Sequence, residues 1–98
     1  MTLDLVVRPF AKREMDEAAQ WYADRSAVSA ARFSQTLAKG LRAIAGDPFG
    51  YPPIGGTTRR YIRAPFPYSL LYRLNPEEIV VLACFHGRRD PARWRLRP

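Results

Sequence analysis

The sequence contains few of the residues on which disulfides and metal centres depend. Its 98 residues include one cysteine, Cys84, and one histidine, His86. A single cysteine cannot form an internal disulfide, and these two residues cannot by themselves supply a conventional zinc site. We therefore expect neither a disulfide-stabilised secreted scaffold nor a structural metal, and no cofactor is implied.

Long hydrophobic runs are also missing. No apolar stretch approaches the roughly 20 residues that a membrane-spanning helix needs. The first five residues, Met-Thr-Leu-Asp-Leu, lack the charged start and the long apolar segment of a signal peptide. We therefore expect a cytoplasmic protein that has no membrane partner.

Acidic side chains are scarce relative to basic ones. The chain has 16 Lys and Arg residues against 9 Asp and Glu residues, which gives a net charge of +7. The excess lies in the second half, because residues 1–47 carry 7 basic and 6 acidic side chains and residues 48–98 carry 9 and 3. Fourteen of the basic residues are Arg. Genomic base composition explains Arg over Lys but not the uneven distribution, which favours a polyanion or an acidic protein as partner.

The rest of the composition is that of one small globular domain over residues 1–98, with 47% hydrophobic and 26% charged residues. Hydrophobic periodicity and turn residues predict the element order β-α-α-β-β-β. This order indicates an α+β fold, in which a helical hairpin packs on one face of an antiparallel sheet of about four strands. A short basic C-terminal tail, residues 87–98, follows. The predicted strands are 3–8, 58–63, 68–74 and 79–86, and the predicted helices are about 11–25 and 30–45.

Both predicted helices contain features that bear on packing. Gly40 lies inside the second helix, where it costs about 1 kcal/mol relative to Ala, and we expect it to allow close packing against the first helix. On the first helix, Lys12 with Asp16 and Arg13 with Glu17 have the i,i+4 spacing of ion pairs. We interpret its acidic residues as part of a solvated face rather than as a metal or acid/base cluster.

Arginines and aromatic residues alternate along the predicted sheet and tail. Basic groups follow phosphates and exposed aromatic rings stack on unpaired bases, so this pattern is compatible with nucleic-acid contact. The alternative is that the tyrosines are core residues and the arginines line a solvated rim. Tyr68 and Tyr72 share a strand face with Leu70 and Leu74, which favours a core position for those two. The residues concerned are Arg59, Arg60, Arg63, Arg73, Arg88, Arg89 and Arg93, with Tyr61, Tyr68, Tyr72 and Trp94.

His86 is the only side chain here whose ordinary pKa lies near neutrality. With Arg88 and Arg89 it forms the candidate catalytic group for RNA cleavage, in which a base takes the 2′-hydroxyl proton and a cation stabilises the charged phosphorane. No carboxylate pair flanks it, so a strand-end histidine that orders the tail is the favoured interpretation. Cys84 has no second cysteine beside it, and we expect a buried strand residue.

Two segments resemble the C-terminal half of the RelE/ParE toxin superfamily. Residues 66–73 read F-P-Y-S-L-L-Y-R, and residues 79–91 end in H-G-R-R-D-P. The P-Y-x-x-x-Y strand and the H-x-R-R-D-P-x-x-W ending, from His86 to Trp94, are similar to the ParE branch in particular. The element order and the Pro/Gly-rich loop after the second helix agree with this resemblance.

The resemblance implies the toxin of a type II toxin–antitoxin pair. Such a toxin is neutralised by a cognate acidic antitoxin, which wraps a flexible segment around it and commonly carries a DNA-binding domain. ParE-like members are described as inhibitors of DNA gyrase that act by binding, and this is the function that we expect. On this reading the target contacts are Arg59, Arg63, Arg73, His86, Arg88, Arg89, Arg93 and Trp94.

The alternative branch, the RelE-like toxins, cuts mRNA in the ribosome with basic residues and often a tyrosine near the C-terminus. In this chain the strand and loop arginines fall in comparable places. However, no tyrosine follows Tyr72 and no lysine follows Lys39, which argues against ribonuclease activity. A third alternative is a non-toxic basic binding module.

Overall fold

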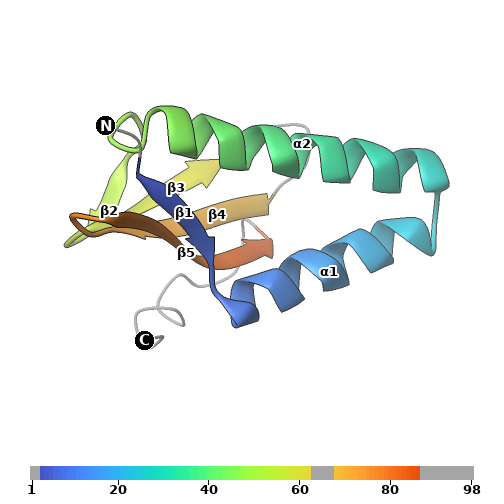
Figure 1. Cartoon of the computed structure of the whole chain (residues 1–98). Helices are drawn as coiled ribbons and strands as arrows, with labels where there is room; N and C mark the ends of the chain where they lie inside the picture. Colours follow the sequence, from blue (N-terminus) through green and yellow to red (C-terminus); the bar gives the residue numbers. More distant parts are fainter. Residues whose placement is uncertain (1–2, 63–67, 87–98) are drawn as a thin grey trace.

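A computed structural model describes residues 3–62 and 68–86 of the chain. Figure 1 shows α1 and α2 side by side as a hairpin, whose connecting turn is the part farthest from the sheet. The predicted α+β fold with a helical hairpin packed on a sheet is confirmed, with one additional strand, β2. The elements are β1 (Asp4–Val7), α1 (Pro9–Ala23), α2 (Ala27–Gly46), β2 (Pro53–Gly55), β3 (Thr58–Ile62), β4 (Tyr68–Leu74) and β5 (Glu78–His86).

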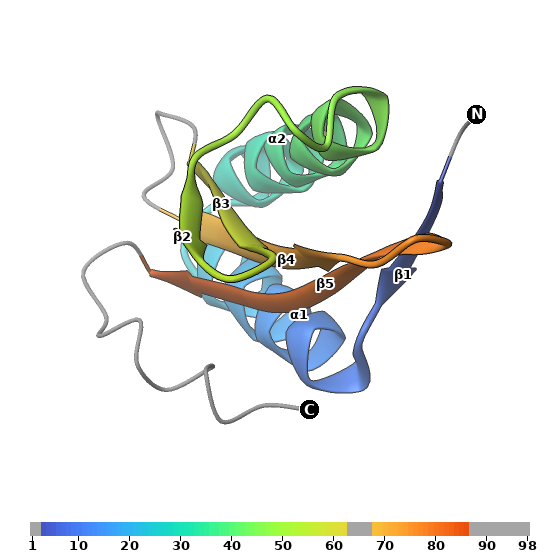
Figure 2. The same ribbon diagram turned by 90° about the vertical axis from the view of Figure 1, so that its left-hand side faces the viewer.

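The sheet has five strands in the order β1-β5-β4-β3-β2, and Figure 2 shows β1 and β2 at its opposite edges. Neighbouring strands are antiparallel except for β1, which pairs parallel with β5. The sheet thus has one strand more than the predicted number of about four, and the prediction that it is antiparallel is wrong for β1 alone. The strand β2 has three residues in a Pro/Gly-rich segment, too few for periodicity to reveal. The direction of β1 depends on a partner more than 70 residues away, which local patterns cannot identify.

Capping groups explain why both helices begin earlier than predicted. The first helical residue of α1 is Pro9. The first N–H groups of a helix have no acceptor within the helix, so proline, which has no N–H, loses no hydrogen bond at this position. Before α2, the Oγ of Ser26 accepts a hydrogen bond of 3.2 Å from the N–H of Ser29. In the described ranges, neither helix has the length and apolar character needed to cross a bilayer.

Strand β5 contributes buried residues to both faces of the sheet. On the helix side, the cluster contains Ala11 and Met15 of α1, Ile44 of α2, and sheet residues that include Tyr72 and Cys84. The cluster on the other face contains Leu71, Val80, Leu82, Ala83 and Phe85 and no helix residue. Every residue of β5 from position 79 to position 85 is at most 3% exposed. The prediction of a central strand with two apolar faces is therefore confirmed.

Gly40 allows α2 to approach the sheet closely. A Cβ atom at this position would lie 2.8 Å from Cε1 of Tyr61 and 3.3 Å from Cδ1 of Leu70. These residues belong to β3 and β4, so the expectation that Gly40 packs against the first helix is wrong. Periodicity places Gly40 on the apolar side of α2, but it does not say which element packs there.

Candidate functional site

The arginines of the expected contact surface are divided between the two faces of the sheet. In the β3–β4 register, Arg59 lies opposite Tyr72 and Arg60 lies opposite Leu71. Side chains alternate along a strand, and Tyr72 belongs to the helix-side core. Arg59 is therefore on the helix side, while Arg60 and Arg73 are on the opposite face.

Arg59 is used within the chain. Its Nη1 donates hydrogen bonds to the backbone oxygens of Tyr51, at 2.7 Å, and Phe49, at 3.2 Å. Beside it, the hydroxyl of Tyr72 donates to the backbone oxygen of Pro48 at 2.6 Å. Burial raises the pKa of Tyr72 to about 12, so this hydroxyl keeps its proton. These two side chains hold the loop between α2 and β2 against the sheet, and contact of Arg59 with a target stays a prediction.

Arg60 and Arg73 lie diagonally across the β3–β4 pair, on the face opposite the helices. Both are half-buried, and no described residue forms a hydrogen bond or an ion pair with either guanidinium. Arg73 pairs with Thr58 on one side and with Val80 on the other. Guanidinium groups on a sheet surface can bind phosphate or carboxylate through two parallel hydrogen bonds. In the described part of the sheet, these two arginines are the best placed to bind a partner, although only Arg73 is among the expected target contacts.

The tyrosines of β3 and β4 face the helices. Tyr61 is 5% exposed and Tyr72 is 0% exposed, so neither ring can stack on a base. The ring of Tyr68 lies 5.2 Å from that of Phe33 and 6.3 Å from that of Tyr22, measured between centroids. A core position is therefore confirmed for Tyr72, and Tyr68 is a half-buried member of an aromatic cluster.

The remaining expected site residues lie at or beyond the end of β5. His86 is the last residue of this strand and pairs with Tyr68 in the register. The assignment of His86 to catalysis or target contact stays a prediction. The same holds for five expected residues that lie outside the described ranges: Arg63, Arg88, Arg89, Arg93 and Trp94.

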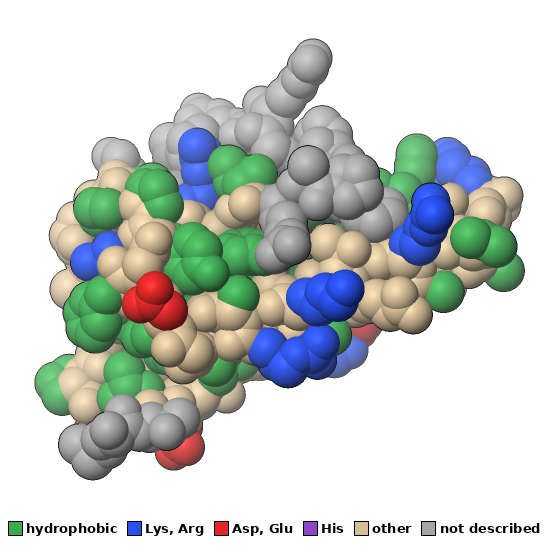
Figure 3. All heavy atoms as spheres, turned by 90° about the horizontal axis from the view of Figure 1, so that it is seen from above, with side chains coloured by type: hydrophobic (Ala, Val, Ile, Leu, Met, Phe, Trp, Pro, Cys, Tyr) green, Lys and Arg blue, Asp and Glu red, His purple; other side chains and the backbone are tan. Residues whose placement is uncertain are grey.

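A second basic surface lies on α2. This helix carries Arg32, Lys39 and Arg42, all exposed, and no acidic residue. Figure 3 looks down on α2 and shows Lys and Arg side chains over its middle. The near-neutral charge of residues 1–47 conceals this surface, because the six acidic residues of that half all lie outside α2, three of them on α1. Counting charge by element rather than by half would have revealed it.

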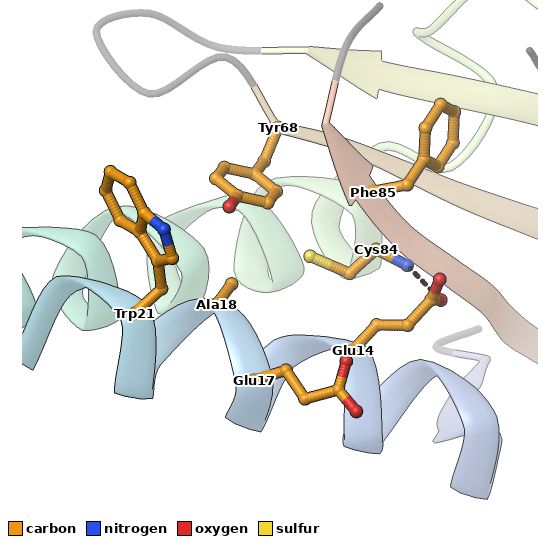
Figure 4. Close-up of a pocket in the computed structure, with 7 residues that line it drawn as sticks. All are labelled: Glu14, Glu17, Ala18, Trp21, Tyr68, Cys84 and Phe85. Carbon is orange, nitrogen blue, oxygen red and sulfur yellow. Dashed lines mark hydrogen bonds between the residues drawn. The ribbon is translucent and has the colours of Figure 1, made fainter. Parts of the chain in front are cut away.

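A cavity of about 230 Å³ lies between α1 and β5. The Oε1 atom of Glu14 accepts a hydrogen bond of 3.1 Å from the backbone N–H of Cys84, as Figure 4 shows. Burial, with a contribution from the Glu14 carboxylate, raises the pKa of the Cys84 thiol to about 12. The thiol is therefore protonated and a poor nucleophile. The lining residues are Glu14, Glu17, Ala18, Trp21, Tyr68, Cys84 and Phe85.

The sequence contained no signal for this cavity, because its two walls are about 70 residues apart in the chain. The prediction that Cys84 is a buried strand residue is confirmed, since it is 2% exposed. In the described ranges, no group of three or more His, Cys, Asp or Glu side chains is placed to hold a metal ion.

Comparison with known proteins gives a match to a family model and matches to solved structures. The sequence model of a family described as "ParE toxin of type II toxin-antitoxin system, parDE" matches residues 5–91. A solved chain titled "Chromosomal ParDE TA system from P. aeruginosa" has a TM-score of 0.75 and 17% sequence identity to this chain. The alignment covers 87% of this chain and 96% of that chain, and at this identity it shows a shared fold. No curated protein matches the sequence.

Proposed function

The chain belongs to the family of ParE toxins of type II toxin–antitoxin systems, and on that premise we propose that it blocks growth by binding DNA gyrase. We further propose that a cognate acidic antitoxin with a DNA-binding domain neutralises it. The observation that carries the proposal is the family match over residues 5–91. The solved ParDE structure supports it through the shared fold.

The charge distribution supports an acidic antitoxin. The chain has a net charge of +7, and the described part presents two separate basic areas. One is the outer side of α2, and the other is the pair Arg60 and Arg73 on the sheet. A flexible acidic segment associates rapidly with such surfaces, because complementary charge steers the encounter.

The arginines and tyrosines described on the sheet are consistent with a protein that acts by binding. A ribonuclease needs a group that takes a proton, and an arginine stays protonated and cannot do so. Tyr61 and Tyr72 are buried on the helix side, and Arg59 holds a loop. What the described part of the sheet offers a partner is therefore the positive charge of Arg60 and Arg73. Binding to gyrase needs no catalytic group, whereas mRNA cleavage in the ribosome does.

The test is pulse-labelling in the first minutes after the chain is induced from a tightly repressed promoter. We expect DNA synthesis to fail while protein synthesis continues. An early halt of protein synthesis would instead favour ribosome-directed mRNA cleavage. Unchanged growth would favour the non-toxic binding module.

Paired variants then test the sheet arginines in a gyrase supercoiling assay with purified proteins. We expect Arg60→Ala with Arg73→Ala to raise the concentration needed for half-inhibition by at least about tenfold, because removing an arginine from a buried charge pair leaves the partner's charge unpaired. The control is Arg32→Ala with Arg42→Ala, which removes the same charge from α2. An equal loss in both pairs would mean that net charge, rather than this sheet face, determines inhibition. Circular dichroism and urea unfolding check that all variants fold.

A further inference from the structure

The surfaces discussed above for gyrase and antitoxin binding do not include the cavity between α1 and β5. Its volume of about 230 Å³ exceeds the roughly 150 Å³ that holds a benzene molecule in a protein interior. The wall on α1 consists of Glu14, Glu17, Ala18 and Trp21, whose spacing of three and four residues places them along one side of the helix. Figure 4 shows this wall opposite the ring of Tyr68 and the thiol of Cys84, while the ring of Phe85 points away from α1.

The two carboxylates of this wall differ in how they are held. The backbone N–H of Cys84 fixes one oxygen of Glu14 at the edge of β5. Glu17 is exposed, and no described cation pairs with it. The i,i+4 pair expected between Arg13 and Glu17 is not formed, because the guanidinium of Arg13 lies over the Phe10 ring, 5.6 Å from its centroid. The carboxylate of Glu17 is therefore available to a cation from outside.

The aromatic wall suits a planar cation. The side chain of Trp21 is 49% exposed, although tryptophan side chains are largely buried on average. The guanidinium of Arg25 already lies 3.5 Å from the centroid of the Trp21 ring and donates to the Trp21 backbone oxygen at 2.8 Å. The indole of this chain thus binds a guanidinium through cation–π contact, and it also forms one end of the cavity.

We propose that the cavity receives one arginine side chain from the antitoxin segment. A guanidinium is flat enough to lie between Trp21 and Tyr68, and it can bind a carboxylate with two hydrogen bonds, which an ammonium cannot. The cavity is lined by two carboxylates and no basic side chain, and Arg25 beside Trp21 balances only one of them. The local charge therefore favours a cation, although the whole chain has a net charge of +7. This inference rests on the antitoxin partnership proposed above.

The first experiment titrates the full-length chain with N-acetyl-L-arginine methylamide and follows the Trp21 indole N–H and the Cys84 amide by NMR. The control probe is the citrulline analogue, which has the same length and a planar urea but no charge. We expect saturable shifts with the arginine probe and at least about tenfold weaker binding of the citrulline probe, because only the former makes charge-assisted hydrogen bonds. Equal affinity of the two probes would overturn the proposal.

Two single variants on α1 test whether the carboxylate of Glu17 binds the arginine probe. Glu17→Gln is expected to weaken binding of the arginine probe about tenfold. Asp16→Asn removes the same charge one residue away, where Asp16 pairs with Lys12 at 2.6 Å, and is expected to change binding by no more than about twofold. Equal weakening by both variants would show a general field effect and would overturn the proposal.

The second experiment adds purified antitoxin, with complex formation measured by size-exclusion chromatography. We expect the complex to abolish the NMR shifts caused by the arginine probe. If the complex forms and the probe still binds, the cavity is not the antitoxin's arginine site and this inference fails alone. If no complex forms, the proposed antitoxin partnership fails, and this inference fails with it.

Discussion

Replacing Gly40 with alanine tests how closely α2 packs on the sheet. In an open helix interior, this substitution stabilises a protein by up to about 1 kcal/mol, because glycine loses more backbone entropy on folding. Here the added Cβ would lie 2.8 Å from Cε1 of Tyr61 and 3.3 Å from Cδ1 of Leu70. The packing contact therefore opposes the gain in helix propensity.

The surroundings of Tyr61 decide which effect is larger. This side chain is 5% exposed, and its ring packs edge-on against Tyr51 with 5.0 Å between centroids. A buried ring held on two sides cannot move freely, and overpacking of a core costs about 1–3 kcal/mol. After subtraction of the propensity gain, we expect Gly40→Ala to lower the free energy of unfolding by up to about 2 kcal/mol.

The measurement is urea unfolding followed by circular dichroism. The matched control is Gly46→Ala at the end of the same helix, where nothing lies within 4 Å of an added Cβ. We expect this control to be neutral or up to about 1 kcal/mol more stable. In a Tyr61→Leu background the penalty of Gly40→Ala should shrink, because the two sites are in contact. The reasoning is refuted if Gly40→Ala is as stable as Gly46→Ala.

Two further predictions concern the buried titratable groups. Tyr72→Phe removes the hydrogen bond to the Pro48 oxygen and should lower the free energy of unfolding by about 1 kcal/mol at pH 7, measured with urea. Burial raises the pKa of Tyr72 above its ordinary value of 10.0 to about 12. The contribution of this raised pKa to the free energy of unfolding is therefore complete below pH 10 and is lost between pH 10 and 12. Stability should therefore fall less over this range in Tyr72→Phe, and parallel pH curves would contradict the assignment. Cys84, whose pKa is raised to about 12, should react with iodoacetamide at pH 8 at least about 100-fold more slowly in the native protein than in urea, by mass spectrometry. Labelling at the unfolded rate would show that the edge of β5 is open.

The accuracy of the sequence predictions varies with how local the determining interaction is. Strand β4 spans Tyr68–Leu74, as predicted, because its apolar alternation is bounded by turn residues on both sides. The helices begin two or three residues early, since their first residues are set by Pro9 and the Ser26 cap rather than by periodicity. Strand β2 was missed because three residues in a Pro/Gly-rich segment form a strand only by pairing with β3.

The candidate site was less predictable than the fold. The sequence identified the arginines as a group, but Arg59 serves the loop while Arg60 and Arg73 remain available on the opposite face. No pattern in the sequence indicated the cavity. Glu14 and Glu17 have the spacing of residues on an exposed helix face, and only the packing of α1 against β5 makes them part of a cavity wall.

The sequence by itself determined the order of the elements, the two apolar faces of β5 and the resemblance to ParE toxins, since each depends on patterns within short stretches of chain. Only the tertiary structure decided that β1 runs parallel to β5, that Gly40 faces Tyr61, and that neighbouring arginines have different surroundings. The physical reason is register. A shift of one residue in strand pairing moves every side chain to the other face of the sheet, and that pairing is chosen by contacts between distant segments.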